Sequence, residues 1–141
     1  MAANTILLKG RGVHEEALAG EIFKPGNLVI KSSLGKYLKN TLTTGADVQI
    51  LIVKEDALQS KTITDAYAAD NIAFAWIPEP GARMQVRLPA SASAIIIGDR
   101  LQADATGCAI KLASGKPLFR AEEAVDNSAG GAEVFITVTV I

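Results

Sequence analysis

The sequence contains few of the residue types from which many functional sites are built. Of its 141 residues, one is a cysteine, Cys108, and one is a histidine, His14. A single cysteine excludes an intrachain disulfide and a thiolate metal cluster. One histidine and one distant cysteine cannot supply the four ligands, or three plus water, that zinc requires. We therefore expect no metal site and no cofactor.

The sequence also lacks an excess of charge of one sign. Its formal net charge is −1, and its lysines and arginines are scattered singly. Proteins that bind nucleic acid or anionic lipid usually carry a basic stripe or patch, so we expect neither partner. Apolar runs such as Ala94 to Ile97 are far too short to span a bilayer,. The first residues do not form a secretory signal, which predicts a soluble protein made in the cytoplasm.

Motifs that carry catalysis are incomplete. The sequence Gly10-Arg11-Gly12 resembles the start of a dinucleotide-binding loop, but Glu15 replaces the third glycine,. Paired carboxylates such as Glu15 and Glu16 would point to opposite faces of a strand, so they are poor acid–base pairs. Cys108 follows a turn and has no basic neighbour that would activate its thiol. The sequence therefore predicts a protein that is not an enzyme.

Short β-prone segments recur every ten to fifteen residues and are separated by turn residues. The turn signals include Pro25-Gly26-Asn27 and the loop from Asp126 to Gly131. His14 to Ala19 has a helical composition but could form little more than one turn before Gly20. The expected strands cover residues 28–30, 48–53, 72–77, 84–88, 109–112 and 134–141,.

This pattern predicts one mostly β domain. We expect a sandwich or a small β-barrel, with at most one or two short helices. The interpretation divides the chain into residues 1–22, an N-terminal arm or first strand, and residues 23–141, the β domain proper.

Two features could form an interface with another protein. The run Thr5, Ile6, Leu7 and Leu8 is apolar and close to the N-terminus. It could be an arm that adds a strand to a neighbour's sheet edge, or it could be the first strand of the domain itself. Trp76 lies in an apolar segment; its surroundings favour the core, although tryptophan is also a frequent interface anchor.

Several segments, in this order, resemble the head decoration proteins, or cement proteins, of tailed bacteriophages. The similarity extends from Phe23 to Ile141. The matching segments are Lys24-Pro25-Gly26, Leu58 to Asp70 followed by a strand and Pro80-Gly81, Gly98-Asp99-Arg100-Leu101 with the turn at Asp104 to Gly107, and Ala121 to Ser128 before a glycine-rich loop and a final strand.

The resemblance implies a β-barrel or β-tulip-like domain that serves as a structural virion protein on the outer surface of the expanded capsid. Proteins of this family bind the major capsid protein, usually as trimers or dimers at local symmetry axes, and bridge neighbouring subunits. For this chain the resemblance favours a homotrimer over a homodimer. It transfers no catalytic residue.

A second reading belongs to another class of protein. A small β domain could bind a small molecule or a glycan, for example as a host-attachment accessory protein. Such a site normally contains clustered aromatic side chains, and only 5% of the chain is aromatic. This alternative remains open at the level of the sequence.

Overall fold

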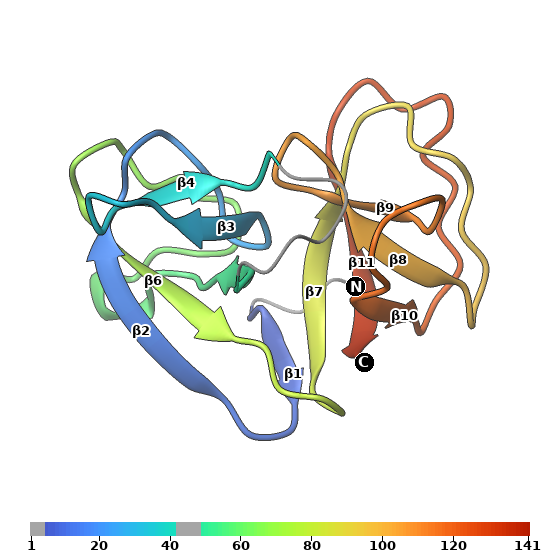
Figure 1. Cartoon of the computed structure of the whole chain (residues 1–141), viewed down its shortest axis with the longest axis horizontal. Helices are drawn as coiled ribbons and strands as arrows, with labels where there is room; N and C mark the ends of the chain where they lie inside the picture. Colours follow the sequence, from blue (N-terminus) through green and yellow to red (C-terminus); the bar gives the residue numbers. More distant parts are fainter. Residues whose placement is uncertain (1–4, 42–48) are drawn as a thin grey trace.

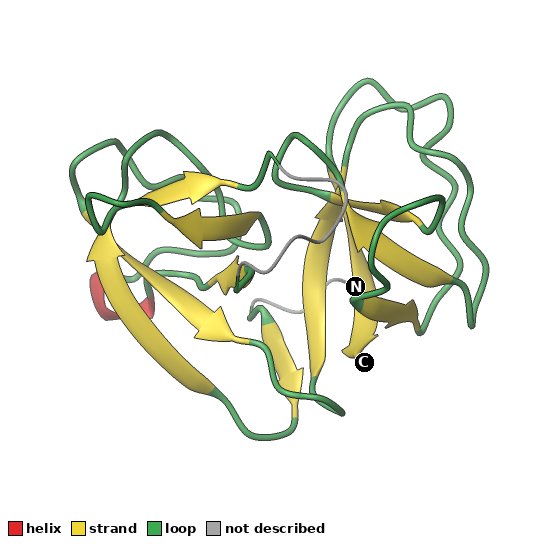
Figure 2. Cartoon of the chain, viewed as in Figure 1, coloured by secondary structure: helices red, strands yellow, loops and turns green. Residues whose placement is uncertain are grey.

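A computed structural model describes residues 5–41 and 49–141 and contains two antiparallel sheets (Figures 1 and 2). In spatial order, the six-stranded sheet contains β1 (Leu7–Lys9), β7 (Arg83–Leu88), β11 (Val134–Val140), β10 (Phe119–Ala121), β8 (Arg100–Ala103) and β9 (Ala109–Lys111). The five-stranded sheet contains β2 (Val13–Leu18), β6 (Ile72–Ile77), β5 (Leu51–Val53), β3 (Leu28–Lys31) and β4 (Tyr37–Lys39).

The predicted fold class is confirmed. The chain forms one small, mostly β domain, and the only helix in residues 5–41 and 49–141 is a single 3₁₀ turn, η1 (Ala57–Gln59). Neither sheet closes into a barrel. In the described residues, no helix is long and apolar enough to cross a membrane.

The segment with helical composition, His14 to Ala19, is extended in the structure. Residues 13–18 form β2, which pairs with β6 from Val13 opposite Ile77 to Leu18 opposite Ile72. Its backbone hydrogen bonds therefore go to a strand that lies about sixty residues away in the sequence. Tertiary pairing of this kind overrides weak local helix propensity.

Two apolar clusters lie on opposite faces of the five-stranded sheet. Successive residues alternate between them, as a strand requires. Leu28 and Ile52 belong to the main core, which the six-stranded sheet supplies on its other side. Val29 and Val53 belong to a second cluster, together with Phe23 and other residues outside the sheet. The five-stranded sheet is thus apolar on both faces.

The five-stranded sheet curls around this second cluster. Ala19, just after β2, forms an isolated bridge with Tyr37 at the start of β4, and the Gly20 N–H donates to the Tyr37 carbonyl at 2.8 Å. The two outer strands of the sheet therefore meet at one point. The Tyr37 hydroxyl closes the same side by donating to the Glu15 carboxylate at 2.9 Å.

A buried arginine ties β7 to the loops that precede β3 and β6. The guanidinium of Arg87, on β7, donates from Nε to the Pro25 carbonyl at 2.7 Å and from Nη2 to the Ile63 carbonyl at 3.0 Å. Its Nη1 lies 3.6 Å from the Glu133 carboxylate. The Phe135 ring stacks under the guanidinium at 4.3 Å. We name these contacts, with Cys108 below, the Arg87 junction.

Cys108 extends the Arg87 junction. Its thiol donates to Glu133 Oε2 at 3.4 Å, and its N–H donates to Asp104 Oδ1 at 2.8 Å. Burial, followed by the nearby charges of Glu133 and Asp104, raises the pKa of the thiol to about 12. The thiol is therefore protonated at neutral pH and is a poor nucleophile.

Candidate functional site

The N-terminal run predicted as an interface begins on the surface and enters the core. Thr5 is exposed, Ile6 is fully buried, and Leu7 and Leu8 are half-buried. The Ile6 N–H donates to the Glu55 carboxylate at 3.0 Å, and β1 pairs with β7. Residues 1–4 lie outside the described residues. That this run contacts another chain remains a prediction, as does the division of the chain at residue 22.

Trp76 lies against the same N-terminal segment. It is 9% exposed and belongs to the main core cluster. A Cβ atom placed on Gly12 would lie 2.5 Å from both Leu7 and Trp76, so these two side chains pack directly over the glycine. The structure thus brings together Leu7 and Trp76, which are far apart in the sequence. Only glycine allows this close approach.

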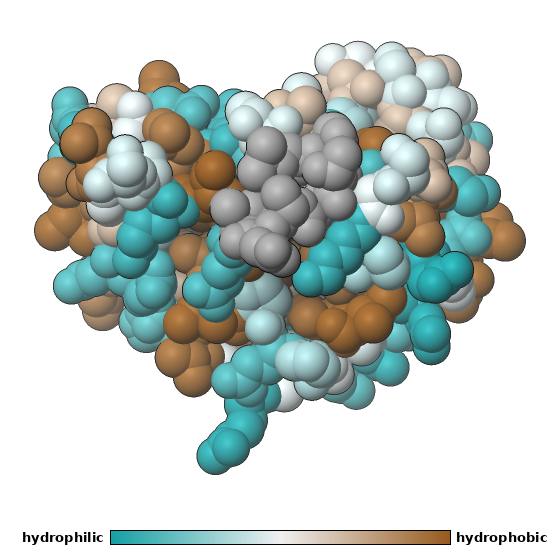
Figure 3. Space-filling view, in the orientation of Figure 1, coloured by the Kyte–Doolittle hydropathy of each residue, from teal (hydrophilic) through white to brown (hydrophobic). Residues whose placement is uncertain are grey.

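The face of the β2–β6 pair that carries Trp76 continues into an open surface. On this face the antiparallel register places Glu16 beside Phe74 and Leu18 beside Ile72. Ile72 is 56% exposed and Leu18 is 42% exposed. On the other side of Phe74 lies Lys54, whose Nζ is 5.9 Å from the ring centroid. We name these five residues the β2–β6 face; apolar side chains reach the surface over β2 and β6 in Figure 3.

A tight turn exposes a second apolar surface. Ile95 is buried, whereas Ile96 and Ile97 are 64% and 67% exposed. The turn is held by two hydrogen bonds between Ile96 and Asp99, each 3.1 Å, and by Gly98 at φ +93°. The two isoleucines are therefore presented by a defined backbone, although the core does not require them.

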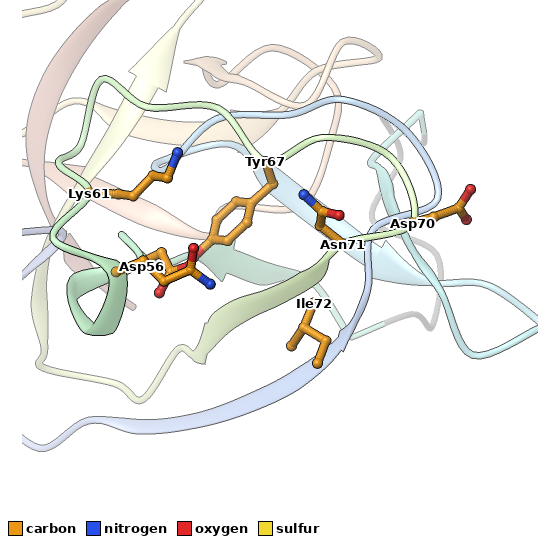
Figure 4. A pocket seen from close by; sticks show the side chains of 7 residues that line it. Asp56, Lys61, Tyr67, Asp70, Asn71 and Ile72 are labelled. Carbon is orange, nitrogen blue, oxygen red and sulfur yellow. The ribbon is translucent and has the colours of Figure 1, made fainter.

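A polar pocket opens at the end of the β2–β6 face, where Ile72 forms part of its wall. Its volume is about 510 Å³. In Figure 4 the Tyr67 ring lies at its centre, with Lys61 and Asp56 on one side and Asn71 and Asp70 on the other. The residues that line the pocket are Asp56, Gln59, Lys61, Tyr67, Asp70, Asn71 and Ile72.

The electrostatics of this pocket are dominated by carboxylates close to Tyr67. Burial raises the pKa of the Tyr67 hydroxyl, and the charges of Asp56 and Glu55 raise it further. The hydroxyl donates to the Lys54 carbonyl at 2.7 Å. Tyr67 is therefore a neutral donor whose proton is already engaged, and it is not poised to act as a base.

The described residues do not assemble a metal centre. Within residues 5–41 and 49–141, no group of three or more His, Cys, Asp or Glu side chains could hold an ion. His14 packs edge-on against Trp76 at 5.5 Å and against Phe74 at 6.0 Å. Among the residues named above, no nucleophile is paired with a base.

Sequence reasoning missed the most informative features of this surface. Nothing in the local sequence distinguishes Asp56, which follows an expected strand, or Arg87, which lies within one. The run Ile95 to Ile97 before Gly98-Asp99 did carry a signal, since three consecutive isoleucines cannot all face one core. No local pattern indicates that residues near 56 and 70 share a pocket.

The fold and these surfaces define a two-sheet antiparallel β domain with exposed apolar side chains and one polar pocket. No family model matches the chain, and no curated protein matches it. Among solved structures it is similar to the head fiber gp8.5 N base of bacteriophage phi29. The TM-score is 0.54 over 93% of this chain and 95% of that chain, at 16% sequence identity. This likeness shows a shared fold.

Proposed function

We propose that this chain is a structural protein of a phage head. It binds the outer surface of the expanded capsid as an oligomer and bridges neighbouring major capsid subunits. The observation that carries the proposal is the similarity of fold to a phage head fiber base, which spans nearly all of both chains. The decoration-protein motifs from Phe23 to Ile141 point to the same class of virion protein.

The surface of the domain supports a role in protein contacts. The β2–β6 face and the Ile96–Ile97 turn expose apolar side chains in well-defined backbone. Exposed apolar surface that the core does not need is typical of interaction sites. We assign both surfaces to contacts with the major capsid protein and with other copies of this chain.

A protein that makes several contacts at once with the capsid can remain bound even when each contact is weak. Each copy can bind weakly, because a copy held by one contact makes its second contact at a high effective concentration. An oligomer that spans several capsid subunits would therefore dissociate far more slowly than a monomer. The homotrimer that the resemblance favours is the form we expect in solution.

The direct test is sedimentation of the purified protein with expanded, undecorated phage heads. We expect retention that saturates at a copy number allowed by the capsid symmetry, and this number also separates trimers from dimers. No retention on expanded or unexpanded heads would overturn the proposal. Saturable binding on a glycan array would then favour the glycan-binding alternative.

Substitutions at the two exposed surfaces sharpen this test. Ile96→Ser with Ile97→Ser should reduce retention and leave the fold intact, because both side chains are mostly solvated. Leu18→Ser with Ile72→Ser tests the β2–β6 face in the same way. The matched control is Leu34→Ser, since Leu34 is 84% exposed and belongs to neither surface. Deleting residues 1–12 would be less informative, because it also removes buried Ile6 and β1.

A further inference from the structure

The pocket beside Ile72 contains a buried carboxylate with an unsatisfied oxygen. Asp56 is 7% exposed, and its Oδ1 has no hydrogen-bond partner in the described part of the chain. Asp56 occupies the N-cap position of η1, where an aspartate usually accepts a bond from a helix N–H. Here its side chain makes no capping bond. Asp56 is also one of the residues that line the pocket.

No donor of the described residues, including those that line the pocket, bonds Asp56 Oδ1. The Tyr67 hydroxyl donates to the Lys54 carbonyl. The Lys61 N–H bonds the main-chain carbonyl of Asp56 at 3.0 Å, but the Lys61 ammonium is in none of the ion pairs of residues 5–41 and 49–141. Asp70 differs, because Lys36 neutralises it at 3.0 Å.

An unpaired carboxylate that is shielded from water is costly, and a partner that brings both a donor and a positive charge relieves that cost most. A neutral hydroxyl or amide would supply a hydrogen bond but leave the charge uncompensated. A bare metal ion would need several further oxygen ligands, and the described residues form no such group. The chemistry therefore favours an organic cation.

We propose that this pocket accepts the guanidinium or ammonium group of an arginine or lysine side chain from a partner protein. The cation would pair with Asp56, and its aliphatic stem would lie against Ile72 and the Tyr67 ring. The position of the pocket, at the end of the β2–β6 face, supports a protein source. A partner that covers Leu18 and Ile72 would have side chains within reach of it.

The test is a titration of the isotope-labelled full-length chain with blocked arginine, N-acetylarginine amide, followed by NMR. We expect saturable shifts confined to the amides around Asp56, Tyr67 and Ile72. The neutral isostere N-acetylcitrulline amide should bind at least about tenfold more weakly, because it keeps the shape and loses the charge. Equal binding of the two probes, or no binding of either, would overturn the proposal.

Variants separate Asp56 from the general negative charge of the region. Asp56→Asn should abolish the shifts, whereas Asp70→Asn should keep affinity within about twofold, since Asp70 already pairs with Lys36,. Ile72→Lys provides a second route that does not alter the buried carboxylate. This substitution places a lysine ammonium beside the pocket. It should therefore prevent N-acetylarginine amide from binding. Retained binding in Asp56→Asn or in Ile72→Lys would count against the assignment.

A free polyamine could also supply an ammonium group to this pocket. Spermidine that binds more tightly than blocked arginine and blocked lysine would overturn the protein-side-chain assignment. The inference does not depend on capsid attachment. Failure of the sedimentation test would leave the titration result intact, and failure of the titration would leave the head-binding proposal intact.

Discussion

Two buried polar regions of this molecule differ in how their charges are satisfied. In the Arg87 junction, every group of the guanidinium has a partner: two main-chain carbonyls and the Glu133 carboxylate. In the pocket, Asp56 is equally buried and one of its oxygens has no partner in the described residues. A satisfied buried charge holds its neighbours in one arrangement. A buried charge without a partner lowers the stability of the fold, and a ligand from another molecule can provide that partner.

Replacing the arginine of the Arg87 junction should cause the largest loss in the free energy of unfolding. Arg87→Met keeps most of the side-chain volume but leaves the carbonyls of Pro25 and Ile63 without donors, and Glu133 without its cation. We expect the free energy of unfolding in urea to fall by about 3–5 kcal/mol. Arg87→Lys should lose less, because it keeps the charge and only some of the hydrogen bonds. A loss below about 1 kcal/mol for Arg87→Met would show that the contacts of the junction contribute little to stability.

A smaller loss should follow from Gly26→Ala, in the turn whose carbonyl accepts the Arg87 N–H at 3.1 Å. Gly26 has φ +87°, and a Cβ there would lie 2.7 Å from the Phe135 ring. We expect a loss of about 2 kcal/mol or more, of which 1–2 comes from the backbone conformation. Gly81→Ala is the matched control, since Gly81 has φ +90° and open space around its Cβ. Equal losses in urea unfolding would exclude a packing contribution from Phe135.

Replacing a carboxylate by an amide should change the free energy of unfolding in opposite directions in the two regions. Glu133→Gln should destabilise by about 1–3 kcal/mol, because it weakens the partner of a buried arginine. Asp56→Asn should leave stability unchanged or raise it by about 1 kcal/mol, because it removes an uncompensated charge. Thermal and urea unfolding at neutral pH measure both. A clear destabilisation by Asp56→Asn would mean that Asp56 has a structural partner after all.

The smallest expected change in stability is the loss at alkaline pH that Cys108 causes. The thiol in the fold has a pKa of about 12, raised from 9.0. Above pH 9 the unfolded thiol loses its proton and the folded one keeps it, so stability falls as pH rises towards 12. We expect a loss on the order of 1 kcal/mol between pH 9 and 10. Cys108→Ala should flatten this slope, and superimposable pH profiles for the two proteins would refute the assignment.

The strands that the sequence identified best are those with strong apolar patterns. Residues 72–77 form β6 with the predicted bounds, and residues 84–88 lie within β7. In β11, Ile136, Val138 and Val140 are buried together, as the period-two alternation predicts,. Residue 48 of the predicted 48–53 strand lies outside the described residues, and the remainder contains β5. Glycine, proline and asparagine turns separated these strands correctly because their backbone preferences are local.

Residues whose role depends on distant partners could not be predicted. Local composition favoured a helix over 14–19, but β6 provides the hydrogen bonds that make this segment a strand. Trp76 was correctly favoured as a core residue, although the sequence could not show that it packs over Gly12.

The sequence by itself determined that this protein is a small, mostly β domain with one cysteine, little net charge and no local catalytic motif. Strand alternation and turn residues are local features of a few residues, and composition needs only the sequence, so all three can be recognised without a structure. Only the tertiary structure decided that Arg87 is satisfied, that Asp56 is not, and that Ile72 lies beside both an open sheet face and a pocket. Burial and pairing of charges depend on which distant segments meet, and no local pattern encodes this directly.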